Sequence, residues 1–146
     1  MQTIQELSEE HWEQWQPLWK GYLEFYRAEL PEETTRSTFA RLVGGGDDSM
    51  FALLALDQGG EGIGLAHCVV HSSTWSEAPS CYLEDLFVAP TARGSGLGRA
   101  LLEEAKGATT RRAAGRLYWH TQSYNGRARS LYDLVARPTS FIVYEM

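Results

Sequence analysis

The glycine-rich segment 93–98 constrains the fold of this 146-residue chain more than any other part of the sequence. It reads Arg93-Gly94-Ser95-Gly96-Leu97-Gly98 and follows an apolar run, residues 81–88, whose composition is typical of a strand. Beyond it, apolar residues recur at the spacing of one helical face: Leu97, Ala100, Leu101 and Ala105. This order predicts a strand, a turn at its carboxyl end, and a helix that begins at the turn.

The remaining apolar runs predict the other strands of a sheet. Runs 50–56 and 63–70 flank Asp57-Gln58-Gly59-Gly60, as in an antiparallel hairpin. Further strands are expected at residues 3–7, 116–121 and 141–144. Strands 81–88 and 116–121 enclose a helix, which predicts a parallel crossover between them.

Helix signals occupy the intervals between these strands. Helices are expected to begin at Ser8, at Pro31 and after the N-cap Asn125, with segment 44–48 ending the second of them. The sequence leaves open whether the first helix divides at Gly21. We therefore expect one α/β domain over residues 1–146, with a mixed central sheet and helices on both faces.

Composition narrows the classes of function. The formal net charge of -6 argues against a nucleic-acid partner and suits a cationic one. No apolar run approaches the ~20 residues of a membrane span, and the first residues lack a secretory signal, so a cytoplasmic protein without a membrane partner is expected. Cys68 and Cys81 lie in apolar runs typical of buried thiols. The histidines at 67, 71 and 120 lack the spacing of metal ligands, so no metal is expected.

The glycine-rich turn has the chemistry of a phosphate site. Glycines before a helix leave backbone N–H groups free and let phosphate oxygens approach, and Arg93 and Arg99 add positive charge. The glycines alone are equally compatible with a turn that binds nothing. A P-loop is excluded because Gly98 is not followed by lysine and a hydroxyl residue. A dinucleotide fingerprint is excluded because the glycine spacing differs and residues 117–121 contain no acid.

Two motifs resemble the GNAT superfamily of acetyltransferases. Arg93, Gly96 and Gly98 match its [Gln/Arg]-x-x-Gly-x-[Gly/Ala] segment, and Asn-x-x-Ala-x-x-Leu-Tyr is matched by Asn125, Ala128, Leu131 and Tyr132. Segments 73–75, 83–88 and 118–121 are similar to polyamine acetyltransferases and to small yeast enzymes that acetylate histones, polyamines or D-amino acids. The chain departs from the pattern after Tyr132, where residues 135–138 replace the usual Gly-Phe pair and one strand follows.

The resemblance implies transfer of acetyl from acetyl-coenzyme A to a primary amine of a small molecule, of polyamine or amino-acid type. A protein or peptide N-acetyltransferase and a non-catalytic acetyl-coenzyme A sensor stay open as alternatives. The expected coenzyme A contacts are Leu86, Phe87, Val88, Arg93, Gly94, Ser95, Gly96, Leu97, Gly98, Arg99, Asn125, Ala128 and Tyr132, with Arg127 as a secondary contact. The backbone near Leu86 and Val88 would supply oxyanion donors if the strands splay there.

The resemblance also implies the catalytic groups. Glu84 would be the base, directly or through water, and Tyr132 the acid for the leaving thiolate. Structural roles stay open for both, because an acid at a strand end can be bonded to backbone and a tyrosine on an apolar helix face can be core. Side chains alternate between the two faces of a strand, so Asp85 should point away from Glu84. A structural role is therefore expected for Asp85.

The residues that contact the acceptor amine and the oligomeric state are expected from aromatic side chains and from a strand edge. Aromatic faces attract ammonium groups, so Trp19, Tyr22 and Trp75 are predicted to contact the amine together with Glu84. Phe25 and Tyr26 share the same helical spacing. A homodimer is expected from the resemblance and from the edge of the strand at 141–144.

Overall fold

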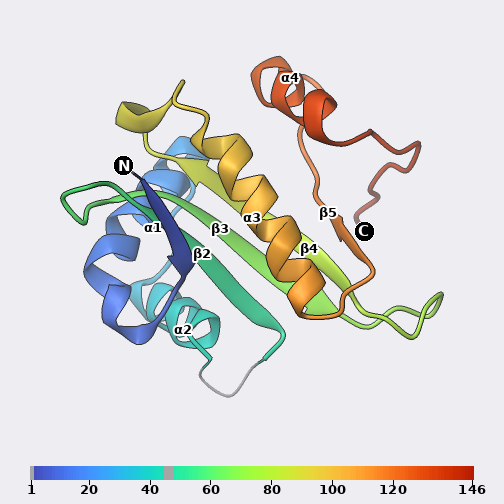
Figure 1. Cartoon of the computed structure of the whole chain (residues 1–146), viewed down its shortest axis with the longest axis horizontal. Helices are drawn as coiled ribbons and strands as arrows, with labels where there is room; N and C mark the ends of the chain where they lie inside the picture. Colours follow the sequence, from blue (N-terminus) through green and yellow to red (C-terminus); the bar gives the residue numbers. More distant parts are fainter. Residues whose placement is uncertain (1, 45–47) are drawn as a thin grey trace.

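The computed structural model describes residues 2–44 and 48–146, and its centre is a mixed sheet (Figure 1). Its five strands lie in chain order: β1 (Thr3–Glu6), β2 (Met50–Leu56), β3 (Gly62–His71), β4 (Ser80–Val88) and β5 (Arg116–Tyr118). Neighbours from β1 to β4 are antiparallel, and β4 and β5 are parallel. The predicted hairpin and the predicted parallel crossover are both confirmed.

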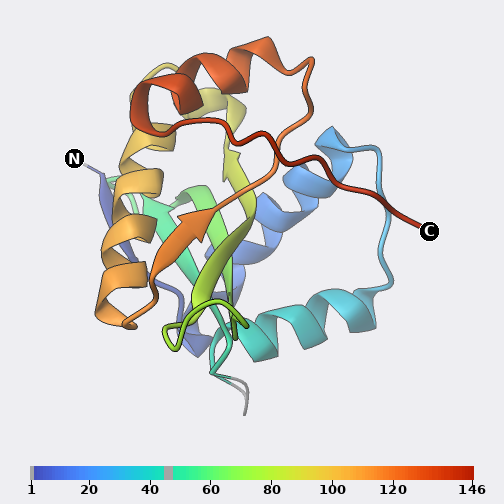
Figure 2. The same cartoon turned by 90° about the vertical axis from the view of Figure 1, so that its right-hand side faces the viewer.

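Helices cover both faces of this sheet, as predicted. The described residues form α1 (Trp12–Phe25), α2 (Glu32–Leu42), α3 (Leu97–Arg111) and α4 (Gly126–Val135), with short 3-10 helices η1 (Glu9–His11) and η2 (Pro90–Ala92). Figures 1 and 2 show α1 and α2 on one face and α3 on the other. Helix α1 passes through Gly21 without a break, and the Phe87 ring lies 3.3 Å from where a Cβ at that glycine would be.

Successive side chains of each strand point to opposite faces of the sheet, so the hydrophobic core is divided between these two faces. In β2, Phe51, Leu53 and Ala55 pack with α3, whereas Ala52 and Leu54 pack with α1 and α2. The period of two in a strand produces this division. Both cysteines are buried free thiols, as expected. The central strands are therefore fixed from both sides and can hold a site at their carboxyl ends.

Strand β5 is shorter than the sequence predicts. Its pairing with β4 ends at Tyr82 and Tyr118, so the predicted strand 116–121 stops three residues early. Beyond that point residues 83–88 of β4 keep β3 as their partner, while the chain after β5 turns away toward α4 (Figure 1). The two strands therefore splay near Leu86 and Val88, which is the condition for free oxyanion donors there.

The predicted strand at 141–144 is wrong. The structure gives this segment no regular structure, and its side chains are exposed, Phe141 by 89%. A strand needs a partner, and β5 offers only three paired residues before the chain leaves the sheet. The edge-strand argument for a dimer therefore has no support within one chain.

Two further expectations concern other parts of the chain. Residues 45–47 of the predicted helix stop 44–48 lie outside the described residues, and α2 ends at Leu42. In the described ranges, no helix has the length and apolar character needed to cross a membrane.

Candidate active site

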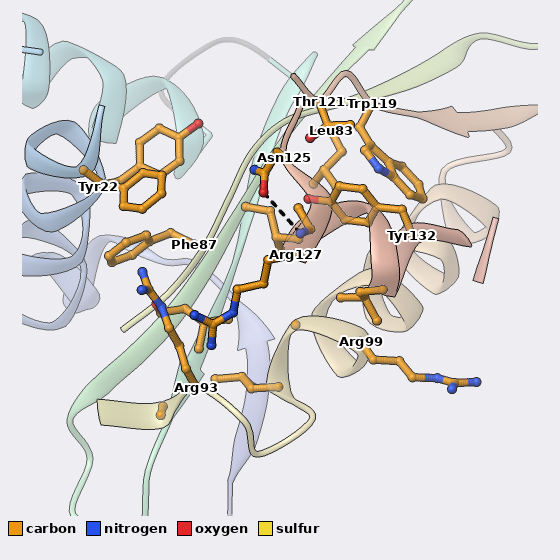
Figure 3. A pocket seen from close by; sticks show the side chains of 18 of the residues that line it. Tyr22, Leu83, Phe87, Arg93, Arg99, Trp119, Thr121, Asn125, Arg127 and Tyr132 are labelled. Atoms are coloured by element: carbon orange, nitrogen blue, oxygen red, sulfur yellow. Dashed lines mark hydrogen bonds between the residues drawn. The ribbon is translucent and has the colours of Figure 1, made fainter. Parts of the chain in front are cut away.

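A cavity of about 470 Å³ opens where β4 and the chain after β5 diverge (Figure 3). Its walls come from the end of α1, β4, the glycine-rich turn, the segment after β5, and α4. The predicted site residues that line it are Tyr22, Glu84, Leu86, Phe87, Val88, Arg93, Gly94, Gly96, Leu97, Gly98, Arg99, Asn125, Ala128 and Tyr132. Residues of the two predicted motifs, which lie far apart in the sequence on the glycine-rich turn and on α4, thus meet around one space.

The glycine-rich turn presents open backbone donors to this cavity. Gly94 and Gly96 have φ values of 81° and 82°, a left-handed conformation that favours glycine. The first helical bond of α3 runs from the Ala100 N–H to the Gly96 carbonyl at 3.1 Å. In the described part of the chain, the N–H groups of residues 94–99 donate to no recorded acceptor, and no side chain caps the helix. Such a helix start has the free donors that an anion-binding site requires.

Three arginines surround the turn and point in different directions. In Figure 3 the guanidinium groups of Arg93 and Arg127 approach one another across the cavity, whereas Arg99 points away. Arg93 donates from Nε to the Val88 carbonyl at 3.1 Å, and Arg99 pairs with Glu103 at 2.9 Å. Within the described ranges no carboxylate pairs with Arg93 or Arg127, which suits binding of a phosphate group.

The gap beside β4 leaves two backbone donors facing the cavity. The Ala89 N–H donates to the Ile63 carbonyl at 2.9 Å, so this group points toward β3. Successive N–H groups of a strand point to opposite sides, and those of Leu86 and Val88 therefore point away from β3. Since β5 pairs only as far as Tyr82, they face the gap.

Glu84 occupies a bulge in β4. His67 pairs with Asp85 and Cys68 with Leu83, so Glu84 is the extra residue. It lines the cavity and stays exposed, and the pKa of its carboxyl is raised by desolvation and then by the charge of Asp85, partly opposed by His67 and Arg41. The Asp85 carboxylate lies 2.9 Å from the His67 ring, a partner that differs from the backbone group considered for a structural role.

Tyr132 faces the cavity from α4. Its hydroxyl points into the space in Figure 3, and its ring meets the Trp119 ring edge to face at 5.4 Å. Burial, followed by the nearby Tyr26, raises the pKa of this phenol above its usual value. The Asn125 side chain accepts from the Ala128 N–H at 3.2 Å, so this residue is a helix cap as well as a wall residue.

Three predicted residues do not line the cavity. Trp19 is 7% exposed and stacks between Trp15 and Tyr22 in the core. Trp75 is 97% exposed in the loop before β4, at the end of that strand opposite the glycine-rich turn. The Ser95 hydroxyl donates back to the Ala92 carbonyl at 2.6 Å. Helical spacing alone could not separate the core aromatic Trp19 from the wall aromatic Tyr22.

Sequence reasoning missed the segment that closes the cavity after β5. Trp119, His120 and Thr121 line the wall, although they were expected to belong to a strand. They do so because β5 ends at Tyr118, a tertiary effect without a local signal. Phe25 and Tyr26, which share the helical spacing of the predicted amine contacts, line the wall formed by the end of α1.

Known proteins match this chain over most of its length. The model of the acetyltransferase (GNAT) family matches residues 4–134. The chain is 35% identical over 136 residues to the D-amino-acid N-acetyltransferase HPA3 of Saccharomyces cerevisiae, covering 91% of this chain and 83% of that protein. It is 34% identical over 118 residues to the uncharacterized N-acetyltransferase YhfO of Bacillus subtilis, covering 80% and 76%.

Solved structures show the same fold. A probable acetyltransferase superposes with a TM-score of 0.86 at 24% identity, covering 99% of this chain and 96% of that one. The aminoglycoside acetyltransferase AAC(6')-Iy, in complex with a bisubstrate analog containing CoA, gives a TM-score of 0.86 at 19% identity, covering 100% and 97%. With the family match over most of its length, the chain belongs to the GNAT family of acetyltransferases and is an enzyme of the N-acetyltransferase class.

Proposed function

We propose that this enzyme transfers acetyl from acetyl-coenzyme A to the primary amine of a small molecule of amino-acid or polyamine type. The observation that carries the proposal is one cavity that joins the open amides of the glycine-rich turn to Glu84 and Tyr132. The similarity to a D-amino-acid N-acetyltransferase supports a small acceptor. The aromatic residues at the end of α1 suit a cationic amine.

The donor set fits coenzyme A. A Cβ built on Gly94 or Gly96 meets nothing within 4 Å, so the turn has room for a diphosphate beside its free amides. Arg93 and Arg127 would neutralise the phosphate charge. The proposed contacts are Leu86, Phe87, Val88, Arg93, Gly94, Gly96, Leu97, Gly98, Arg99, Asn125, Arg127, Ala128 and Tyr132. Ser95 is proposed as a contact through its backbone, because its hydroxyl already donates to Ala92.

The wall residues divide the chemistry between them. When bound, acetyl-coenzyme A supplies a thioester carbonyl for attack and a thiolate as the leaving group. Glu84 takes a proton from the amine, which has a pKa of about 10.4 and arrives protonated. The N–H groups of Leu86 and Val88 donate to the carbonyl oxygen as negative charge develops there. Tyr132 donates its phenolic proton to the departing sulfur.

Release of coenzyme A from acetyl-coenzyme A tests the proposed function. With D- and L-amino acids, diamines and lysine peptides as acceptors, we expect turnover on free amines and little on peptides. Glu84→Gln and Tyr132→Phe should each lower kcat by about 100-fold, the usual contribution of a positioned acid or base. Equal turnover on peptides would favour a protein acetyltransferase. Coenzyme A binding without turnover on any amine would favour a sensor.

The pH dependence of kcat/KM tests the role of Glu84. A base must be ionised, so activity should rise with pH through the pKa of Glu84, which lies above the ordinary value of 4.5. Desolvation and the charge of Asp85 raise this pKa. The rise of kcat/KM on the acidic side of the pH profile should therefore have its midpoint above the usual range for glutamate. Glu84→Gln should remove the limb. A limb that persists unchanged in this variant would assign the titration to another group.

Two glycines with the same backbone strain test the phosphate site. Gly96 and Gly60 have φ values of 82° and 83°, and neither has an atom within 4 Å of an added Cβ. Gly96→Ala and Gly60→Ala should each lower the free energy of unfolding by about 1–2 kcal/mol, the cost of a left-handed L-residue. Gly96→Ala alone should raise the Kd for coenzyme A, by about tenfold if one charge-assisted hydrogen bond is lost. Equal coenzyme A affinity in the two variants, measured by calorimetry, would contradict the assignment.

The assembly and the location stay predictions. A homodimer is supported by the exposed apolar side chains near the carboxyl terminus, among them Phe141 and Ile142, which a second subunit could cover. A cytoplasmic location rests on the sequence features described above.

A further inference from the structure

A row of hydrogen bonds ties α1 to the two strands that form the bulge at Glu84. The Trp15 indole donates from Nε1 to His67 Nε2 at 3.0 Å, and His67 Nδ1 lies 2.9 Å from Asp85 Oδ2. Trp15 is fully buried and His67 is 3% exposed. The imidazole also contacts the rings of Trp15 and Trp19, at centroid distances of 5.9 and 5.1 Å. The proposed acetyl transfer uses none of the groups in this row.

The indole determines which nitrogen of His67 carries the proton. An indole N–H can only donate, so Nε2 of His67 accepts and is unprotonated. The proton of the ring is therefore on Nδ1, which donates to the Asp85 carboxylate. A buried N–H without a partner costs free energy, so the residue opposite His67 on β4 must supply an acceptor.

Two placements of the bulge in β4 satisfy the hydrophobic pattern of the strand. Leu83 packs toward α3 before the bulge, and Leu86 and Val88 do so after it. A strand without an extra residue would turn Leu86 and Val88 to the opposite face of the sheet. One extra residue must therefore lie between 83 and 86, and it can be Glu84 or Asp85.

The two placements differ in which acid lies opposite His67. In the structure Asp85 has this position, and Glu84 is the extra residue that lines the cavity. In the other placement, Glu84 would lie opposite His67 and its carboxyl would be drawn toward the imidazole and out of the cavity. A bulge can thus re-aim a side chain beside an active site. The partner that His67 takes decides which acid reaches the cavity.

We propose that His67 and Asp85, held by Trp15, are positioning residues that place the bulge at Glu84 and so direct its carboxyl into the cavity. The inference rests on the proposed function, because it concerns the base of that reaction. Neither His67 nor Asp85 takes a proton from the amine. Their effect on acetyl transfer passes through the position of Glu84.

Crystal structures of two variants test the placement of the bulge without measuring turnover. Asp85→Ala removes the acceptor, so Glu84 should take the place opposite His67 and residue 85 should become the extra residue. Asp85→Asn removes the charge but keeps an oxygen that can accept from Nδ1, so the wild-type bulge should remain. Asp85→Ala with Glu84 still the extra residue and still in the cavity would overturn the proposal.

The same variants should separate in kcat, measured at a pH at which the wild-type value has reached its plateau. Asp85→Ala should lower kcat by about 100-fold, as loss of a positioned base does, whereas Asp85→Asn should leave it near the wild-type value. In the Glu84→Gln background, Asp85→Ala should lower kcat no further, because both changes remove the same group from the cavity. Additive losses would overturn the proposal, since Asp85 would then act by another route.

Thr109→Val is the matched control for the loss of a buried hydrogen bond. Thr109 is fully buried near the end of α3, and its hydroxyl donates to the Ala105 carbonyl at 2.8 Å. This variant should lower stability and leave kcat unchanged. Asp85→Ala should keep the Kd for coenzyme A within about twofold of wild type, because the glycine-rich turn is not altered. Weaker coenzyme A binding in Asp85→Ala, with an equal loss of kcat in Thr109→Val, would indicate general loosening and overturn the proposal.

The tautomer of His67 gives a second readout, for use if Asp85→Ala does not fold. In wild type and in Asp85→Asn, the ¹⁵N shifts of the imidazole should show the proton on Nδ1 and an unprotonated Nε2. A proton on Nε2 would leave His67 without a donor for Asp85 and would overturn the inference. A bulge and a tautomer that behave as expected in a protein without acetyl transfer would count against the proposed function alone.

Discussion

The early end of the β4–β5 pairing is the constraint on which the site depends. Parallel partners stop at Tyr82 and Tyr118, and the rest of β4 is left with β3 on one side and a cavity on the other. A strand that loses a neighbour exposes backbone N–H groups that must find other partners. Here those groups belong to Leu86 and Val88. The fold thus provides donors at the proposed reaction centre without a dedicated side chain.

The same strand leads into the proposed phosphate site. Because β4 ends at Val88 and α3 begins at Leu97, the intervening turn lies at the carboxyl edge of the sheet beside the gap. The bulge at Glu84 then separates two neighbouring acids by environment: one reaches the cavity, and the other is bonded to His67. Two carboxylates adjacent in sequence are thereby available for different tasks.

Local signals predicted the parts of the site that depend on local chemistry. Glycines before an amphipathic helix and the cap at Asn125 have meanings fixed within a few residues, and the structure places both as expected. The length of β5, the absence of a strand at 141–144 and the burial of Trp19 depend instead on which elements meet in space. The sequence contains no periodicity that reports such meetings. The bulge at Glu84 is likewise visible only when β4 is paired with β3.

The central claim is that backbone amides of the turn hold the diphosphate of coenzyme A. A titration of ¹⁵N-labelled protein with coenzyme A measures these amides directly, with the φ-matched turn at Gly60 as an internal reference. The account predicts that the amide signals of residues 94–99 move downfield and saturate together, while that of Gly60 stays in place. Saturable binding of coenzyme A that leaves the signals of residues 94–99 unmoved would contradict it.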